Sequence, residues 1–141
     1  MHKEGDRMRI RARTISRGRA EGVAVVSEKP VSFLGDVDPE TGDIVDRNSD
    51  VFGENISGKI FIFPESRGST VGTYVLLQMR KKGTAPAGIV MLESEAIVAV
   101  GAIISEIPLV DRPEINVLDM VKNGDRVRIT AGREGLIEID R

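Results

Sequence analysis

The chain begins with a regular alternation of polar and apolar residues. From residue 7 to residue 13 four arginines alternate with the apolar residues Met8, Ile10 and Ala12, and Thr14 and Ile15 follow. A period of two predicts a half-buried strand with one solvated face. A second, more buried strand is expected over residues 23–26, after a turn flanked by Gly18 and Gly22. Residues 31–34 predict a further short strand, and the acidic segment that follows is expected to be a solvated, structured loop.

The middle of the chain predicts a strand, a loop, a helix and a second strand. Residues 60–63 and residues 89–92 are uninterrupted apolar runs of strand length, which is typical of buried parallel strands. Between them, apolar residues recur at helical spacing from Val71 to Met79. Ser69 or Thr70 is suited to cap this helix, and Gly83 is suited to end it. This order predicts a right-handed βαβ unit.

The C-terminal third predicts mostly short strands. Ser94 is expected to cap a short helix that ends near residue 99, and residues 101–105 and 107–110 are expected to be strands. Residues 127–130 and 136–139 alternate and predict a terminal hairpin. We therefore expect one α+β, mainly β domain over residues 1–141. Its central sheet is partly parallel, and it has an additional antiparallel sheet and few helices.

The composition excludes several kinds of chemistry. The chain has no cysteine, so it cannot form a disulfide, bind an iron–sulfur cluster or use a cysteine nucleophile. Its single histidine, His2, lies next to the start, which argues against a Ser-His-Asp triad or a phosphohistidine carrier. Any catalysis must then use hydroxyls, carboxylates, arginine or lysine, or the cofactor of a partner.

Charge and hydropathy narrow the choice of partners. The net charge is −2 and only 4% of the residues are aromatic, which argues against nucleic acid. The arginine row over residues 7–13 is typical of a solvated sheet face, and docking of an acidic partner is the alternative. The chain has no apolar run of membrane-spanning length and no secretory leader, so we expect no membrane contact. The absence of cysteine fits a reducing compartment, so we expect a cytoplasmic location.

The loop before the predicted helix is the best candidate for chemistry. Residues 66–72 combine hydroxyls, one guanidinium and two glycines. Free amides and the positive end of a helix dipole favour an anion there, and Arg67 offers a forked donor for carboxylate or phosphate. Gly68 and Gly72 would let a ligand or another backbone come close. The spacing matches neither a Walker A loop nor a nucleophile elbow, and an ordinary strand–helix turn explains these residues equally well.

Residues 64–76 resemble the signature of the small subunit of aconitase X; they read Pro-Glu-Ser-Arg-Gly-Ser-Thr-Val-Gly-Thr-Tyr-Val-Leu. Further blocks agree with this family in the same order: residues 18–22, 32–42, 85–90, 101–108 and 124–127. The resemblance covers about residues 14–130. It implies a swivelling β/β/α domain that pairs with a large aconitase-X-type subunit as a heterodimer. It also implies that the large subunit carries a 4Fe-4S cluster.

Within the family the resemblance is to the archaeal phosphomevalonate dehydratases. It implies a hydro-lyase subunit, inactive without its partner, for conversion of (R)-5-phosphomevalonate to trans-anhydromevalonate 5-phosphate in a modified mevalonate route to isoprenoids. The resemblance assigns the proton acceptor to Ser69, with Ser66 in the same loop as the alternative. From the residues themselves we expect the phosphorylated substrate to contact Arg67, Gly68, Thr70 and Gly72. The alternatives are a cis-3-hydroxyproline-type dehydratase subunit and a non-catalytic interaction module.

Overall fold

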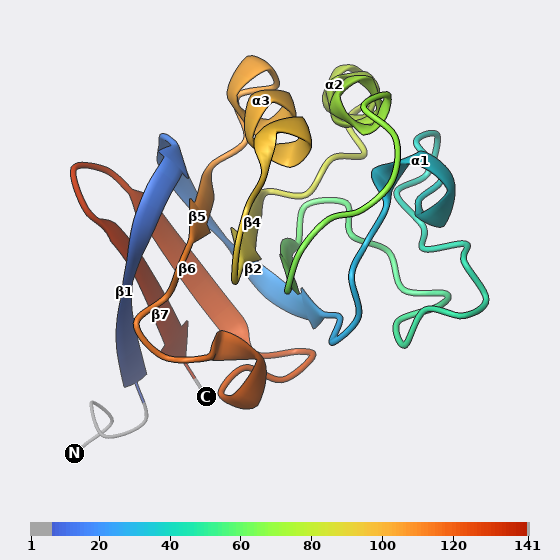
Figure 1. Ribbon diagram of the computed structural model, residues 1–141. Coiled ribbons are helices and arrows are strands. Elements are labelled where there is room, and N and C mark those ends of the chain that lie inside the picture. Colours follow the sequence, from blue (N-terminus) through green and yellow to red (C-terminus); the bar gives the residue numbers. More distant parts are fainter. Residues whose placement is uncertain (1–6, 141) are drawn as a thin grey trace.

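The computed structural model of the chain describes residues 7–140, so His2 lies outside the described residues. Within that range seven strands close into a barrel, and two helices cover one side of it (Figure 1). The strands are β1 Arg7–Ser16, β2 Gly18–Val26, β3 Ile60–Phe63, β4 Gly88–Met91, β5 Leu109–Asp111, β6 Arg126–Ala131 and β7 Gly135–Asp140. The helices are α1 Phe33–Asp36, α2 Gly72–Lys82 and α3 Ala96–Ile104, with a 3-10 turn, η2, at Val117–Asp119.

The barrel has a parallel part and an antiparallel part. Strands β2, β3, β4 and β5 are parallel neighbours, whereas β6 and β7 pair as an antiparallel hairpin. The long strands β1 and β2 take part in both, because β1 pairs with β7 and then β5, and β2 pairs with β6 and then β3. The predicted parallel middle and antiparallel ends are confirmed. The two sheets join along β1 and β2, so the closed barrel leaves no free edge.

Two apolar layers explain the uninterrupted runs in the sequence. Ile60 and Ile62 of β3 belong to the cluster that fills the barrel. Phe61 and Phe63 alternate with them and belong to the cluster beneath the helices. The strand is therefore buried on both faces, as its sequence predicts. Phe33 lies edge-on to both phenylalanines, with ring centroids 6.2 and 5.9 Å away, and this contact anchors α1 against β3.

Several predicted boundaries are wrong. Residues 18–22 are the first half of β2 and not a turn. Gly22 is needed there because a side chain would meet the Gly58 carbonyl oxygen, 2.9 Å from the position of a Cβ. Residues 33–36 form the short helix α1 and not a strand. The Asp36 carboxylate accepts the Ser32 amide at 2.8 Å, and Gly35 adopts a φ of 106°, so the chain turns back.

Both helix starts also differ from the prediction. Helix α3 is capped by Glu95 and not by Ser94, and it continues to Ile104 through residues expected to be a strand. Helix α2 begins at Gly72, and neither Ser69 nor Thr70 caps it. A turn over residues 69–72 precedes the helix and uses the local amides itself. The predicted end of α2 is confirmed, because Gly83 has a φ of 78° and donates its amide to the last carbonyls.

Candidate active site

The loops that follow the parallel strands meet at one edge of the barrel. The Arg67 amide after β3 donates to the Val31 carbonyl after β2 at 3.0 Å. The Leu92 amide after β4 donates to the Pro64 carbonyl at 3.0 Å. The Arg112 amide after β5 donates in turn to the Leu92 carbonyl, also at 3.0 Å. The candidate loop therefore lies at the carboxyl ends of parallel strands, where α/β folds place their ligands.

Ser69 lies in this loop, three residues before α2 begins at Gly72. Its side chain is exposed, and its Oγ accepts the Val71 amide at 3.1 Å. Its carbonyl accepts the Gly72 amide at 3.0 Å. Of the amides at positions 70–72, only that of Thr70 has no partner within residues 7–140. Of the free amides expected at this helix start, one donor therefore remains, because the turn occupies those of Val71 and Gly72.

Ser66 has a different environment. Its Oγ donates to the Glu95 carboxylate, and the same carboxylate caps α3 by accepting the amides of Ile97 at 3.0 Å and Val98 at 3.2 Å. Ser66 also bridges to Val31 through its backbone. Its hydroxyl therefore fastens the loop to the start of α3. An alkoxide at Ser66 would lie beside a second negative charge.

The two glycines of the loop contact the protein itself. Gly68 has a φ of 98°, and a Cβ there would be 2.6 Å from the Ser32 Oγ. Gly72 is buried, and a Cβ there would be 3.4 Å from the Ile97 Cγ2. Of the two possibilities raised by the sequence, these glycines allow the approach of another part of the chain. They shape the loop that presents Ser69.

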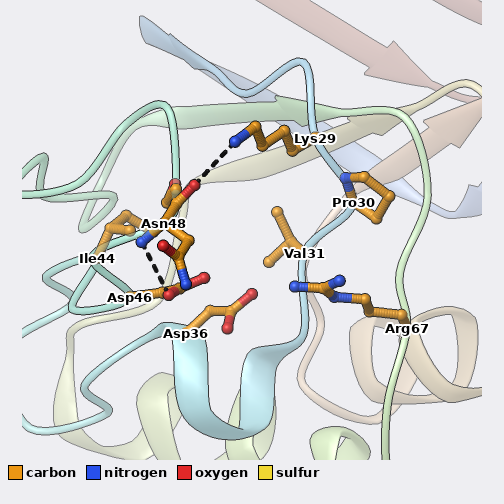
Figure 2. Close-up of a pocket in the computed structure, with 9 residues that line it drawn as sticks. Lys29, Pro30, Val31, Asp36, Ile44, Asp46, Asn48 and Arg67 are labelled. Carbon is orange, nitrogen blue, oxygen red and sulfur yellow. Dashed lines mark hydrogen bonds between the residues drawn. The ribbon is translucent and has the colours of Figure 1, made fainter.

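Arg67 points into a cavity of about 310 Å³ beside the loop. Figure 2 shows its guanidinium facing the Asp36 carboxylate across this space. The guanidinium makes no hydrogen bond or ion pair with any described residue, so its donors are open to a ligand. The cavity is lined by Lys29, Pro30, Val31, Asp36, Ile44, Asp46, Asn48, Ser49 and Arg67. Ser69 is absent from this lining, so the two residues of one loop face different spaces.

A charged cluster at the same edge was missed by the sequence analysis. Asp111 is fully buried and accepts Arg13 Nε at 2.8 Å and Nη2 at 2.9 Å. It also accepts the Ser94 amide at 2.9 Å and the Ser94 Oγ at 2.7 Å. Burial acts to raise the pKa of Asp111, but the hydrogen bonds from Arg13 and Ser94 outweigh it and lower the pKa below the ordinary 3.8. The sequence offered one signal for this cluster: Asp111 is an acidic residue at the end of an apolar strand.

An exposed ion pair adjoins this cluster. Arg112 donates to Glu93 with an Nη2–Oε2 distance of 3.0 Å, and this bond holds the pKa of Glu93 below its ordinary value. Arg112 adopts a φ of 47°, which is uncommon for a residue with a side chain. The loops after β4 and β5 are thus joined by charge-assisted bonds, and Ser94 and Glu95 connect them to the Ser69 loop.

The family model of the aconitase X swivel domain matches residues 9–139. The chain belongs to the aconitase X swivel-domain family. The resemblance seen in residues 64–76 is confirmed, over a longer span than the motifs alone indicated. In this aconitase X swivel domain, no helix of residues 7–140 is long and apolar enough to cross a membrane. Over the same residues no three acidic or histidine side chains gather into a possible metal site.

Several named relatives of this aconitase X chain are archaeal. It is 52% identical over 132 residues to the phosphomevalonate dehydratase small subunit of Methanosarcina acetivorans, covering 94% of this chain and 91% of the relative. It is 54% identical to the protein of the same name from Pyrococcus furiosus, covering 94% and 96%. The crystal structure of Thermococcus kodakaraensis aconitase X in its holo-form matches with a TM-score of 0.89 and 47% identity, over 95% of this chain and 99% of that one. The predicted fold class is confirmed.

Proposed function

We propose that this chain is the small subunit of a phosphomevalonate dehydratase and acts together with a large subunit. The complex removes water from (R)-5-phosphomevalonate and gives trans-anhydromevalonate 5-phosphate, a step of a modified mevalonate route to isoprenoids. Support comes from archaeal relatives of that name at about 50% identity, which the chain matches over nearly their full length. It also comes from the loop at the carboxyl edge of the parallel strands, which presents an exposed hydroxyl and an open guanidinium.

In this proposal Ser69 is the base. The elimination breaks a C–H bond next to the substrate carboxylate and a C–O bond on the adjacent carbon, and it forms one C=C bond. The proton goes to the Ser69 oxygen, and the hydroxyl leaves as hydroxide with the electron pair of its C–O bond. The abstracted proton and this hydroxide together make the released water, and no oxidant is consumed. A serine alkoxide needs stabilisation by fixed donors. The Val71 amide donates to the Ser69 Oγ at 3.1 Å at the positive end of α2, and this contact is the observation that carries the assignment.

The same reasoning argues against Ser66 as the base. Its hydroxyl donates to the Glu95 carboxylate, so proton loss would place two negative charges in contact. Ser66 instead holds the loop in place. The two serines that the sequence leaves as alternatives therefore have opposite electrostatic surroundings, and only that of Ser69 favours an anionic oxygen.

We assign the anionic part of the substrate to Arg67 and to the Thr70 amide, so the substrate would extend from the cavity across the loop to reach Ser69. The Arg67 guanidinium has unused donors that face the cavity, and its fork suits phosphate or carboxylate. Lys29 adds a second positive charge to the same lining, and Asp36 and Asp46 balance the two cations, so the anion contact rests on the open donors of Arg67. Gly68 and Gly72 serve the site by setting the shape of the loop.

The residues of this chain do not fit an iron–sulfur cluster, since the chain contains no cysteine. We therefore place the 4Fe-4S cluster implied by the family on the large subunit, and this chain contributes Ser69 and the anion contacts. We expect the complex to be cytoplasmic. The active site is then complete only when the two subunits are assembled.

Anaerobic co-purification with the large subunit tests this function. We expect a complex of equal stoichiometry that contains iron and sulfide, dehydrates (R)-5-phosphomevalonate and leaves cis-3-hydroxyproline unchanged. Turnover of cis-3-hydroxyproline alone would replace the proposed substrate with the alternative. A complex without iron and without either activity would contradict the dehydratase function and favour a non-catalytic module.

A further inference from the structure

We propose that the outward surface of α2 and α3 is the docking surface for the large subunit. This inference rests on the proposed function, because that function requires such a partner. We call the surface the α2–α3 apolar face. In the described part of the chain nine large apolar residues are exposed, and five of them form this face: Val71, Tyr74, Val100, Ile103 and Ile104.

The composition of α3 is unusual for a helix on a protein surface. None of its nine residues has a charged or polar side chain. Val98, Gly101 and Ala102 face inward and are buried, whereas Val100 and Ile103 remain 46% and 53% exposed. A helix that packs on a core from one side normally has polar residues on the other side. An apolar outer surface of this kind indicates an interaction site.

Helices α2 and α3, which carry these exposed residues, pack directly against each other. The two helices lie side by side over the barrel (Figure 1). The Thr73 Oγ1 donates to the Ile97 carbonyl at 2.9 Å, and a Cβ on Gly101 would be 2.9 Å from the Leu76 Cδ1. The helices are therefore in direct contact. The exposed apolar residues of both helices therefore belong to one layer of the fold.

The α2–α3 apolar face begins at the proposed active site. Val71 donates its amide to Ser69, and Tyr74 follows one helical turn later. The first residues of α3 adjoin Glu95, which holds Ser66 of the same loop. A substrate bound on the large subunit must reach Ser69, so the partner has to approach this edge. The apolar face continues from that point along α3, whereas the last turn of α2 carries Arg80, Lys81 and Lys82.

The arginine row on β1 is a weaker candidate for the docking surface. Arg7 pairs with Asp140 at 2.9 Å and Arg9 with Glu138 at 3.5 Å, both across to β7. Arg126 of β6 pairs with Glu21 of β2 at 3.2 Å. These charges are already compensated by carboxylates of the same chain, so an acidic partner would have to displace them. The five residues of the α2–α3 apolar face are uncharged, so a partner has no ion pair of theirs to displace. They fit a partner surface of aliphatic and aromatic side chains.

Tyr74 allows a direct test, because it is the only tyrosine of the chain. The full chain labelled with 3-fluorotyrosine gives one 19F resonance, at a side chain that is 67% exposed. We expect this resonance to shift or broaden in proportion to added large subunit. A resonance that stays unchanged while the complex forms would overturn the proposal.

Substitution gives an independent test. Val100→Asp and Ile103→Asp should each raise the dissociation constant for the large subunit at least 100-fold. The matched control is Ile115→Asp, in the loop after β5, where the wild-type side chain is 43% exposed; it should change the constant less than threefold. Circular dichroism confirms that each variant is folded. Equal effects of all three variants, or none, would overturn the proposal.

Two further outcomes separate this inference from its alternatives. If the isolated chain is a dimer that Ile103→Asp converts to a monomer, while affinity for the large subunit is unchanged, a second copy covers the face and the proposal is wrong. If Ser69→Ala keeps full activity while Val100→Asp still abolishes assembly, the catalytic assignment fails and the docking surface stands.

Discussion

Asp111 provides the clearest prediction about stability. Its carboxylate is fully buried and accepts four hydrogen bonds, two from Arg13 and two from Ser94. Asp111→Asn removes the charge and directs an amide donor at the guanidinium of Arg13. The substitution therefore breaks a largely desolvated ion pair and loosens the loop between β4 and α3. That loop includes Glu95, which holds Ser66.

The size of the effect follows from the exposure of the two partners. Breaking a buried ion pair typically costs about 3–5 kcal/mol. The Arg13 side chain is 43% exposed, so its unpaired charge regains water and the expected cost falls to about 2–3 kcal/mol. For a chain of 141 residues the entropy of unfolding is about 0.3 kcal/mol per degree, so Tm should fall by roughly 7–10 °C.

Thermal and urea unfolding at pH 7 measure this loss. The matched control is Asp140→Asn, which breaks a pair of similar length with Arg7, also on β1, at 2.9 Å. Both partners of that pair are nearly half exposed, so the control should lose less than about 1 kcal/mol. Equal losses in the two variants would refute the argument that burial makes the Asp111 pair important.

Three other predictions concern the same edge of the barrel. Gly68→Ala should lower the free energy of unfolding by about 1–3 kcal/mol, because the φ of Gly68 is 98° and a Cβ would be 2.6 Å from the Ser32 Oγ. Its control, Gly53→Ala, has a similar φ but open space around the Cβ. The control should therefore lose less stability in the same urea titration. Glu95→Ala should lower kcat more than it raises KM, and Glu95→Gln should restore most activity; unchanged kinetics would contradict a positioning role. The stability that Asp111 provides should be present above its ordinary pKa of 3.8 and be lost as pH falls through its lower folded pKa, so the difference in unfolding free energy from Asp111→Asn should vanish in acid.

The sequence predicts most accurately those elements whose pattern of apolar and polar residues fits only one type of secondary structure. The alternation in β1 and in the β6–β7 hairpin permits only a half-buried strand, and both are confirmed. The run in β3 followed by the helical spacing of α2 is equally decisive. These elements are determined by local periodicity. They account for most of the barrel.

The errors occur where a residue serves a distant contact. Gly22 signals a turn locally, but in the structure it makes room for the backbone at Gly58. Residues 101–104 look like a strand because α3 is apolar on its outer surface as well, and an apolar run hides the helical period. The residues of the candidate active site show the same dependence on distant contacts. Ser69 was found from its motif, whereas the contact between Ser66 and Glu95 joins residues 29 positions apart and left no local signal.

The central claim is that Ser69 is the base in a site shared with the large subunit. The most direct measurement is the rate of (R)-5-phosphomevalonate dehydration by the anaerobically assembled complex carrying Ser69→Ala, with Ser66→Ala as the matched control. We expect Ser69→Ala to lower kcat at least about 1,000-fold without changing assembly or iron content, and Ser66→Ala to keep most of its activity. Full turnover by the Ser69→Ala complex, or a loss confined to Ser66→Ala, would contradict the account.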